Sequence, residues 1–167
     1  PLQIITYRSG YTGEDGLQVV IPAPLVPFLL PKLFGTKERP HPVVKPAGLG
    51  ARDTLRIEAA MPLYGHELGE EVDSLTAGQA WCVDLNKDFI GVEPMRRLNE
   101  RGLPRKLVGL ELDGRRIARQ HSVVYGGGRA VGEVTSGTLS PTLGKSIAMA
   151  FVTADSSSDG TALEVEV

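Results

Sequence analysis

This sequence of 167 residues is poor in cysteine, in long apolar runs and in net charge. Its single cysteine, Cys82, excludes an internal disulfide and is compatible with a reducing compartment. No apolar run approaches the roughly 20 residues that a membrane-spanning helix requires. The formal net charge is only -2, so no basic field favours nucleic acid or an anionic membrane surface. We therefore expect neither nucleic acid nor a membrane as a partner.

Several kinds of site also lack their usual motifs. The three histidines, His41, His66 and His121, are scattered, and no cysteines are paired, so we expect no metal site. The glycine-rich stretch GYTGEDG lacks the Gly-Lys-Ser/Thr ending of a phosphate loop, and GLGARD lacks the third glycine of a dinucleotide fingerprint. No nucleophile elbow is present either. These absences argue against nucleotide-binding and serine-hydrolase sites.

The first part of the chain contains both strand and helix patterns. Residues 3–8 and 17–22 are rich in β-formers and flank the glycine-rich stretch, which predicts two strands around a tight connection. A short helix is predicted to begin near Pro24 and to be limited by Pro31. Residues 35–46 predict an exposed connection. Apolar residues at 51, 55 and 59 have helical spacing and predict a second helix, ended by Pro62.

The second part of the chain is richer in strand patterns. The run AWCVDL, residues 80–85, predicts a strand in which Cys82 is buried. Residues 92–102 predict a helix with Pro94 in its first turn and Gly102 just past its end. Further short strands, separated by turns, are typical of a small antiparallel sandwich or barrel. They are predicted over residues 106–112, 122–125, 130–137, 145–152 and 161–167.

The change in pattern near residues 102–105 marks the expected domain boundary. We expect an α+β region over residues 1–103 and a β domain over residues 104–167. The chain begins at Pro1 rather than Met, and it ends on the strand-like run LEVEV. Both ends are therefore expected to continue in a longer polypeptide.

Taken singly, the motifs indicate little about function. The stretch GYTGEDGLQ, residues 10–18, is most simply a turn between two strands. Arg52 and Arg56 lie four residues apart on the predicted helix and are most simply solvated charges, paired with Asp53 or Glu58. Each motif alone supports only a soluble α+β protein.

In their order along the chain, the motifs indicate a family. The runs GYTGEDG, GLGARDTLRIEAAMPLYG, KDFIG, PRKLVGLEL and GEVTSGTLSPTLGKSIAMAFV resemble the aminomethyltransferase family, the T-protein of the glycine cleavage system. The resemblance implies an α+β fold: part of ferredoxin-like α+β domains over residues 1–103, then a small antiparallel β-barrel over residues 104–167 that lacks its last strand. It also implies a preceding portion with the catalytic aspartate. No catalytic residue is therefore expected in this chain, which alone should be inactive.

The same resemblance implies a reaction, a cosubstrate and a partner. The lipoylated H-protein would carry an aminomethyl group on its lipoyl arm, and ammonia would be released from it. The one-carbon unit would pass to tetrahydrofolate, with no metal. Such chemistry depends on holding the folate nitrogens against a reactive carbon in a shielded cavity. The implied location is a bacterial cytoplasm or a mitochondrial matrix.

Three residues match folate-binding positions of the family. Tyr11 is expected to line the pterin cavity, and Arg52 is expected to contact folate. Gln18 stands where the family has a glutamate that grips the donor edge of the pterin. That exchange should weaken or re-pose folate, because an amide offers one acceptor to an edge with two donors. Glu14 and Tyr64 have weaker claims as ligands, since both lie in turns.

Two other functions stay open. Gln18 and the unmatched N-terminal portion favour a folate-binding module without transferase activity. An upstream dinucleotide fingerprint would instead indicate the folate-dependent part of a dimethylglycine or sarcosine oxidising enzyme. The upstream sequence separates the three alternatives.

Overall fold

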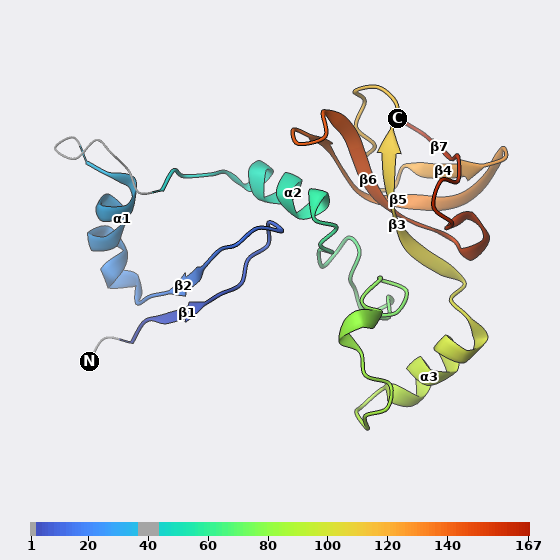
Figure 1. Cartoon of the computed structure of the whole chain (residues 1–167), viewed down its shortest axis with the longest axis horizontal. Helices are drawn as coiled ribbons and strands as arrows, with labels where there is room; N and C mark the ends of the chain where they lie inside the picture. The colour runs from blue at the N-terminus through green and yellow to red at the C-terminus, as the bar shows by residue number, and fades with distance from the viewer. Residues whose placement is uncertain (1–2, 37–43) are drawn as a thin grey trace. The chain divides into compact units, whose positions relative to one another are not determined.

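The chain divides into two compact units, Pro1–Ala59 and Ala60–Val167, each described separately below. The computed structural model describes residues 3–36 and 44–167 (Figure 1). Most of the predicted connection over residues 35–46, including His41, lies outside the described residues. The elements of the first unit are β1 (Ile5–Tyr7), β2 (Gln18–Val20), the short 3-10 helix η1 (Ala23–Leu25), α1 (Val26–Phe34) and α2 (Leu49–Glu58).

In the first unit, β1 and β2 form an antiparallel pair with Tyr7 opposite Gln18. The prediction of two strands flanking the glycine-rich stretch is therefore confirmed, although every residue of both strands is exposed. The prediction of a second helix is confirmed by α2. That helix ends before Pro62, because Ala60 has a positive φ of 53° and turns the chain out of the helix.

The second unit contains one larger sheet. Its elements are η2 (Ala80–Cys82), α3 (Val92–Arg101), β3 (Arg105–Leu112), β4 (Val123–Gly126), β5 (Arg129–Ser140), β6 (Lys145–Thr153), η3 (Ala154–Ser156) and β7 (Glu164–Val165). The strand order is β3-β6-β5-β4-β7, with every neighbouring pair antiparallel. The helix predicted over residues 92–102 is confirmed, with Gly102 as the residue that ends it.

One hydrophobic cluster of the second unit lies on one face of this sheet. Ala148, Ala150 and Val152, which alternate along β6, belong to it, as the period of two in a strand requires. The fully buried members are small, so the strands and the segment before β4 approach closely. They are Ala118, Val124, Val134, Ala148, Ala150 and Val152.

One close approach in this core depends on a glycine. A Cβ atom placed on Gly137 of β5 would lie 2.1 Å from the carbonyl oxygen of Ala118. The obstacle is backbone and not a flexible side chain, so it cannot move aside cheaply. Position 137 therefore accepts only glycine if the segment around Ala118 is to lie this close to β5.

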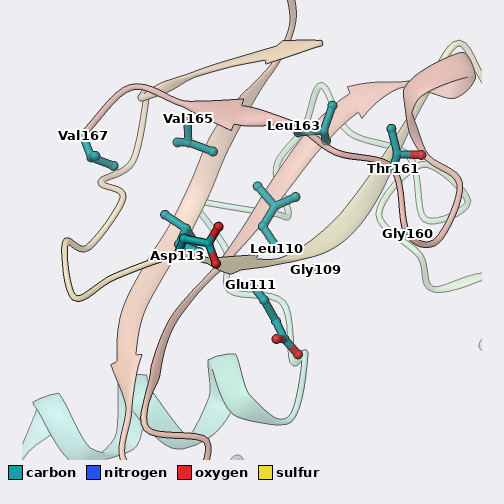
Figure 2. Close-up of a pocket in the computed structure, with 10 residues that line it drawn as sticks. Gly109, Leu110, Glu111, Asp113, Gly160, Thr161, Leu163, Val165 and Val167 are labelled. Atoms are coloured by element: carbon teal, nitrogen blue, oxygen red, sulfur yellow. The ribbon is translucent and has the colours of Figure 1, made fainter. Parts of the chain in front are cut away.

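The sheet does not close into a ring among the residues that the structure describes, because β3 and β7 are its two edge strands. A cavity of about 590 Å³ lies where β3 faces the segment that contains β7. Figure 2 shows Leu110 and Glu111 on opposite sides of β3, with Leu163 and Val165 on the segment across the cavity. The mixed class with antiparallel sheets is confirmed, and the expected barrel is an open five-stranded sheet.

The prediction of a strand over residues 80–85 is wrong, and so is the expected burial of Cys82. This run forms η2 and then an irregular segment, and the Cys82 thiol is exposed and donates to the carbonyl of Gln79 at 3.0 Å. A short apolar run does not distinguish a strand from a turn. Trp81 in the same run is 82% exposed, so these apolar residues do not report a buried strand.

Two smaller points complete the fold. The strand predicted over residues 161–167 is reduced to Glu164–Val165, and its partner is β4. Across the described ranges, no helix is long and apolar enough to cross a membrane. The boundary predicted between residues 103 and 104 stays a prediction.

Candidate functional site

Two of the predicted folate residues meet in the first unit. Tyr11 lies at the start of the glycine-rich turn, and Arg52 lies on α2, 41 positions later in the sequence. The guanidinium carbon of Arg52 is 4.4 Å from the centre of the Tyr11 ring, a cation–π contact. The fold thus brings together the first motif and the GARD motif.

The two arginines of α2 have different surroundings. Arg52 is exposed, whereas Arg56 is only 1% exposed and its Nε donates to Asp53 at 2.8 Å. The expected pairing of Arg56 with Asp53 is confirmed, and the expected solvation of Arg56 is wrong. A buried guanidinium requires partners that are fixed in place. Arg56 therefore has a structural role within α2. Arg52, which is exposed, is the arginine that a ligand can reach from solvent.

Gln18 and Glu14 flank the same turn. Gln18 begins β2, opposite Tyr7, and its side chain is exposed. Glu14 is exposed as well, and its backbone N–H donates to the Thr12 hydroxyl at 3.3 Å, a contact that shapes the turn. Their roles as folate ligands stay predictions.

Tyr64 belongs to the second unit. Its side chain is 68% exposed, and its backbone forms an isolated bridge with Leu68. The loop that it begins is folded tightly, because the N–H groups of three successive residues point to the carbonyl of Leu63. The ligand role of Tyr64 is likewise still a prediction.

A buried polar cluster follows Tyr64, and the sequence analysis missed it. Glu67 is fully buried, and its carboxylate accepts from the Leu63 N–H at 2.9 Å and from the Ser136 hydroxyl at 2.6 Å. His66 Nδ1 lies 2.9 Å from the carbonyl oxygen of Thr135. A carbonyl only accepts, so His66 carries a proton on Nδ1.

This cluster joins two motifs that the sequence lists separately. His66 and Glu67 follow directly after MPLYG, and Thr135 and Ser136 belong to GEVTSGTLS. A buried carboxylate with two donors fixes the loop on β5 more strictly than apolar contacts would. The available sequence signal was the pair His66-Glu67 directly after Gly65. No known spacing rule connects such a pair with a buried cluster, so the sequence alone did not predict it.

A second polar cavity, of about 490 Å³, lies beside this loop in the second unit. Its lining includes Arg105, whose guanidinium carbon is 4.7 Å from the centre of the Phe151 ring, and His121, whose Nδ1 is 2.6 Å from Glu133. Arg105 and Glu133 in this lining carry opposite charges, so the lining selects no particular sign of ligand. The structure assigns no chemistry to this cavity.

The remaining electrostatic features are modest. Over residues 3–36 and 44–167, no group of three or more histidine, cysteine or acidic side chains could hold a metal ion. At the surface, Lys145 Nζ lies 2.7 Å from Glu111. The hydrogen bond to Glu111 and then its charge raise the pKa of Lys145.

Comparison with known families decides the relationship of the chain. The family model described as the GCVT N-terminal domain matches residues 2–87, and the model described as the glycine cleavage T-protein C-terminal barrel domain matches residues 105–167. The chain belongs to the glycine cleavage T-protein family. The family resemblance of the sequence motifs is thereby confirmed.

Individual relatives agree with this family. The chain is 48% identical to an aminomethyltransferase of Thermosynechococcus vestitus over 96% of its length, and 46% identical to one of Symbiobacterium thermophilum over 97%. A crystal structure of glycine cleavage system aminomethyltransferase T from Bartonella henselae superposes with a TM-score of 0.89 at 32% identity over 98% of the chain. The chain spans 42%, 43% and 45% of those three proteins respectively.

Proposed function

We propose that this chain supplies folate contacts of a glycine cleavage aminomethyltransferase. The enzyme would take a one-carbon unit from the aminomethyl-lipoyl group of the H-protein and deliver it to tetrahydrofolate, with release of ammonia. The single observation that carries the proposal is the stacking of Arg52 on Tyr11, at 4.4 Å, in a chain of this family. The names of the relatives support the same reaction.

The stacked pair suits the chemistry of folate. When a guanidinium lies face-on over an aromatic ring, its N–H edges remain available for a carboxylate. The tail of folate carries carboxylates, and its pterin ring is flat and apolar on its faces. Tyr11 is half-buried and Arg52 is exposed, so both groups can meet a ligand that arrives from solvent. These residues therefore fit the proposed cosubstrate.

Folate supplies the nitrogens that receive the one-carbon unit, and the residues of this chain orient it. Arg52 would hold an anionic part of folate by a bidentate, charge-assisted contact. Tyr11 would keep Arg52 in place and cover one side of the site. Gln18 would accept one hydrogen bond from the pterin edge. Orientation of this kind lowers the barrier by pre-paying the entropy of bringing reactants together.

The first experiment measures the proposed reaction in the full-length protein. Aminomethyl-loaded H-protein and tetrahydrofolate should yield methylene-tetrahydrofolate and ammonia. Arg52→Met should lower the affinity for tetrahydrofolate by roughly tenfold to a hundredfold, the loss expected for a charge-assisted contact. Arg101→Met, an exposed arginine at the end of α3, is the matched control and should change nothing. Equal affinity of the Arg52→Met variant and the wild type would refute the assigned site.

A second experiment addresses Gln18. Replacing it with glutamate supplies a carboxylate that accepts two parallel N–H bonds. Once the bound pterin covers this exposed position, the carboxylate should stabilise the complex by about 1–3 kcal/mol. Calorimetric titration of full-length wild type and Gln18→Glu with tetrahydrofolate measures the gain. Absence of any gain for the glutamate form would show that Gln18 does not face the pterin edge.

Gln18 is also the observation that favours a second function, a folate-binding module without turnover. The two functions differ in one result, because the module would bind tetrahydrofolate but form no methylene-tetrahydrofolate with loaded H-protein. We further propose a bacterial cytoplasm or a mitochondrial matrix as the location. The 167-residue chain alone is expected not to turn over, and product formation by it would contradict that expectation.

A further inference from the structure

The glycine-rich turn touches α2 at a second point besides the stacked pair. Gly13 has a φ of +76°, and a Cβ placed on it would lie 2.7 Å from the Cβ of Ala59. Real Cβ atoms essentially never come that close. The turn therefore lies against the end of α2. Between Gly13 and Ala59 there is no room for one more carbon atom.

The two points of contact lie on the same face of α2. Arg52 and Ala59 are seven residues apart, which is close to two helical turns and about 10 Å along the axis. On the turn, Tyr11 and Gly13 are two residues apart and make the matching contacts. Tyr11 and Thr12 are the half-buried residues of the turn, which agrees with a turn laid along the helix.

The helix side of this contact carries the buried residues of α2. Arg56 and Ile57 are buried, and Arg56 is tied to Asp53 within the helix. The exposed Arg52 side chain, in contrast, depends on the Tyr11 ring for its position. A change in the distance between the glycine-rich turn and α2 would therefore move Tyr11 and leave α2 in place.

We propose that Gly13 is a positioning residue for the ligand contacts, acting through Ala59. Its missing side chain lets the turn close on the end of α2, and this closure sets the Tyr11 ring under the Arg52 guanidinium. The inference rests on the proposed function only for the ligand, because the positioning itself is a property of the first unit. Any side chain at position 13 lifts the turn and releases Arg52.

The central test uses full-length protein and four variants. Gly13→Ala should weaken tetrahydrofolate binding by about threefold to thirtyfold, the range expected for loss of a cation–π contact at a partly buried site. Gly10→Ala is the matched control in the same turn, since a Cβ there meets nothing closer than 3.8 Å. It should bind as the wild type does.

A rescue separates positioning from backbone strain. Gly13→Ala also places alanine at a positive φ, which is unfavourable wherever it occurs. The double variant Gly13→Ala with Ala59→Gly removes the collision and keeps the strain. Recovery of affinity in the double variant supports positioning through Ala59. No recovery shows that Gly13 serves only the conformation of the turn and overturns the inference.

Ala59→Val reaches the same contact from the helix side. It adds bulk without touching the positive φ of Gly13, so it serves if Gly13→Ala fails to fold. It should weaken tetrahydrofolate binding as Gly13→Ala does, mainly by raising KM with kcat nearly unchanged. Unchanged KM in a folded Ala59→Val protein overturns the inference.

A spectroscopic readout keeps this test separate from the proposed function. The NMR shift of the Arg52 side chain reports the ring current of Tyr11 in the absence of folate. Gly13→Ala and Ala59→Val should move it toward the value of a Tyr11→Leu variant, and Gly10→Ala should not. If no protein binds tetrahydrofolate, the proposed function fails while this shift still decides the positioning. If Arg52→Met lowers the affinity for tetrahydrofolate, but Gly13→Ala changes neither that affinity nor the NMR shift of Arg52, the positioning role of Gly13 is refuted. The proposed function then still stands.

Discussion

The two units of the chain bury their apolar residues to very different extents. The second unit has a core of fully buried small residues between strands and the segment before β4. In the first unit, both strands are exposed along their whole length, and burial is concentrated in Arg56 and Ile57 of α2. Because burial of apolar surface is the main source of stability, the second unit should dominate the stability of the chain. The proposed folate contacts lie in the first unit.

The comparison separates positions that the fold requires from positions that a ligand would use. It predicts that substitutions in the sheet change the free energy of unfolding, whereas similar ones in β1 or β2 change it little. Four experiments on the 167-residue chain, one of which compares a matched pair of variants, measure these contributions.

The largest effect is expected for Gly137→Ala. The added Cβ would collide with the backbone carbonyl of Ala118. Either β5 or the segment around Ala118 must therefore shift, at a cost of about 3 kcal/mol or more. Urea unfolding followed by circular dichroism measures the loss. Gly109→Ala in β3, where a Cβ meets nothing within 4 Å, is the control. A loss below about 1 kcal/mol for Gly137→Ala, within the range of ordinary substitutions, would contradict the close approach.

Glu67→Gln should come next, with a loss of about 2 kcal/mol. The amide keeps the size of the carboxylate but loses its charge. Its oxygen can still accept from the Leu63 N–H, but its NH2 group must then donate to the Ser136 hydroxyl, so two neutral hydrogen bonds replace two charge-assisted ones. Urea unfolding measures this loss of stability as well. Glu70→Gln, at an exposed position, is the matched control. Equal stability of the two variants would mean that the cluster does not fix the loop.

A matched pair of valines compares the units directly. Val134 is fully buried in the sheet, and Val19 of β2 is 53% exposed. Val134→Thr buries a hydroxyl and should cost about 1–3 kcal/mol, whereas Val19→Thr should stay within about 0.5 kcal/mol. Chemical denaturation of both variants gives the difference. Similar losses would show that the first unit buries Val19 in solution and that the contrast between units is not real.

The smallest effect is expected for Lys145→Met at the surface. Since Glu111 raises the pKa of Lys145 in the folded state, the contact stabilises the fold fully below the unfolded pKa, near 10.4. That stability is lost as pH rises through the raised folded pKa. Melting temperatures of wild type and Lys145→Met should therefore differ slightly at pH 7 and converge once the pH exceeds the raised folded pKa of Lys145. A gap that widens with pH would reverse the sign of this linkage.

Much of the fold could be predicted from local patterns. Glycine turns and β-rich runs located all five strands of the sheet, because each strand lies between residues with a strong turn preference. The run around Cys82 failed, since a few apolar residues between turns do not require a strand partner. The last strand was overestimated, because only Glu164 and Val165 meet β4.

The candidate site was predictable only in part. Tyr11 and Arg52 were chosen from a family resemblance, but nothing in the sequence showed that they touch each other. The burial of Arg56 was also hidden, since the helical spacing of Arg52 and Arg56 treats them alike. Glu67 and Ser136 lie 69 positions apart, and no local pattern links a carboxylate with a hydroxyl over that separation.

The close approach of Gly137 to the backbone of Ala118 has a consequence for interpreting natural variants of this protein. A variant at this position would reduce the amount of folded protein in the cell, because a destabilised chain is cleared by proteases. A low rate of the proposed reaction in an organism with such a variant would then reflect abundance. Measuring protein level beside activity would separate such folding variants from those that alter Arg52 or Tyr11, where abundance should stay normal.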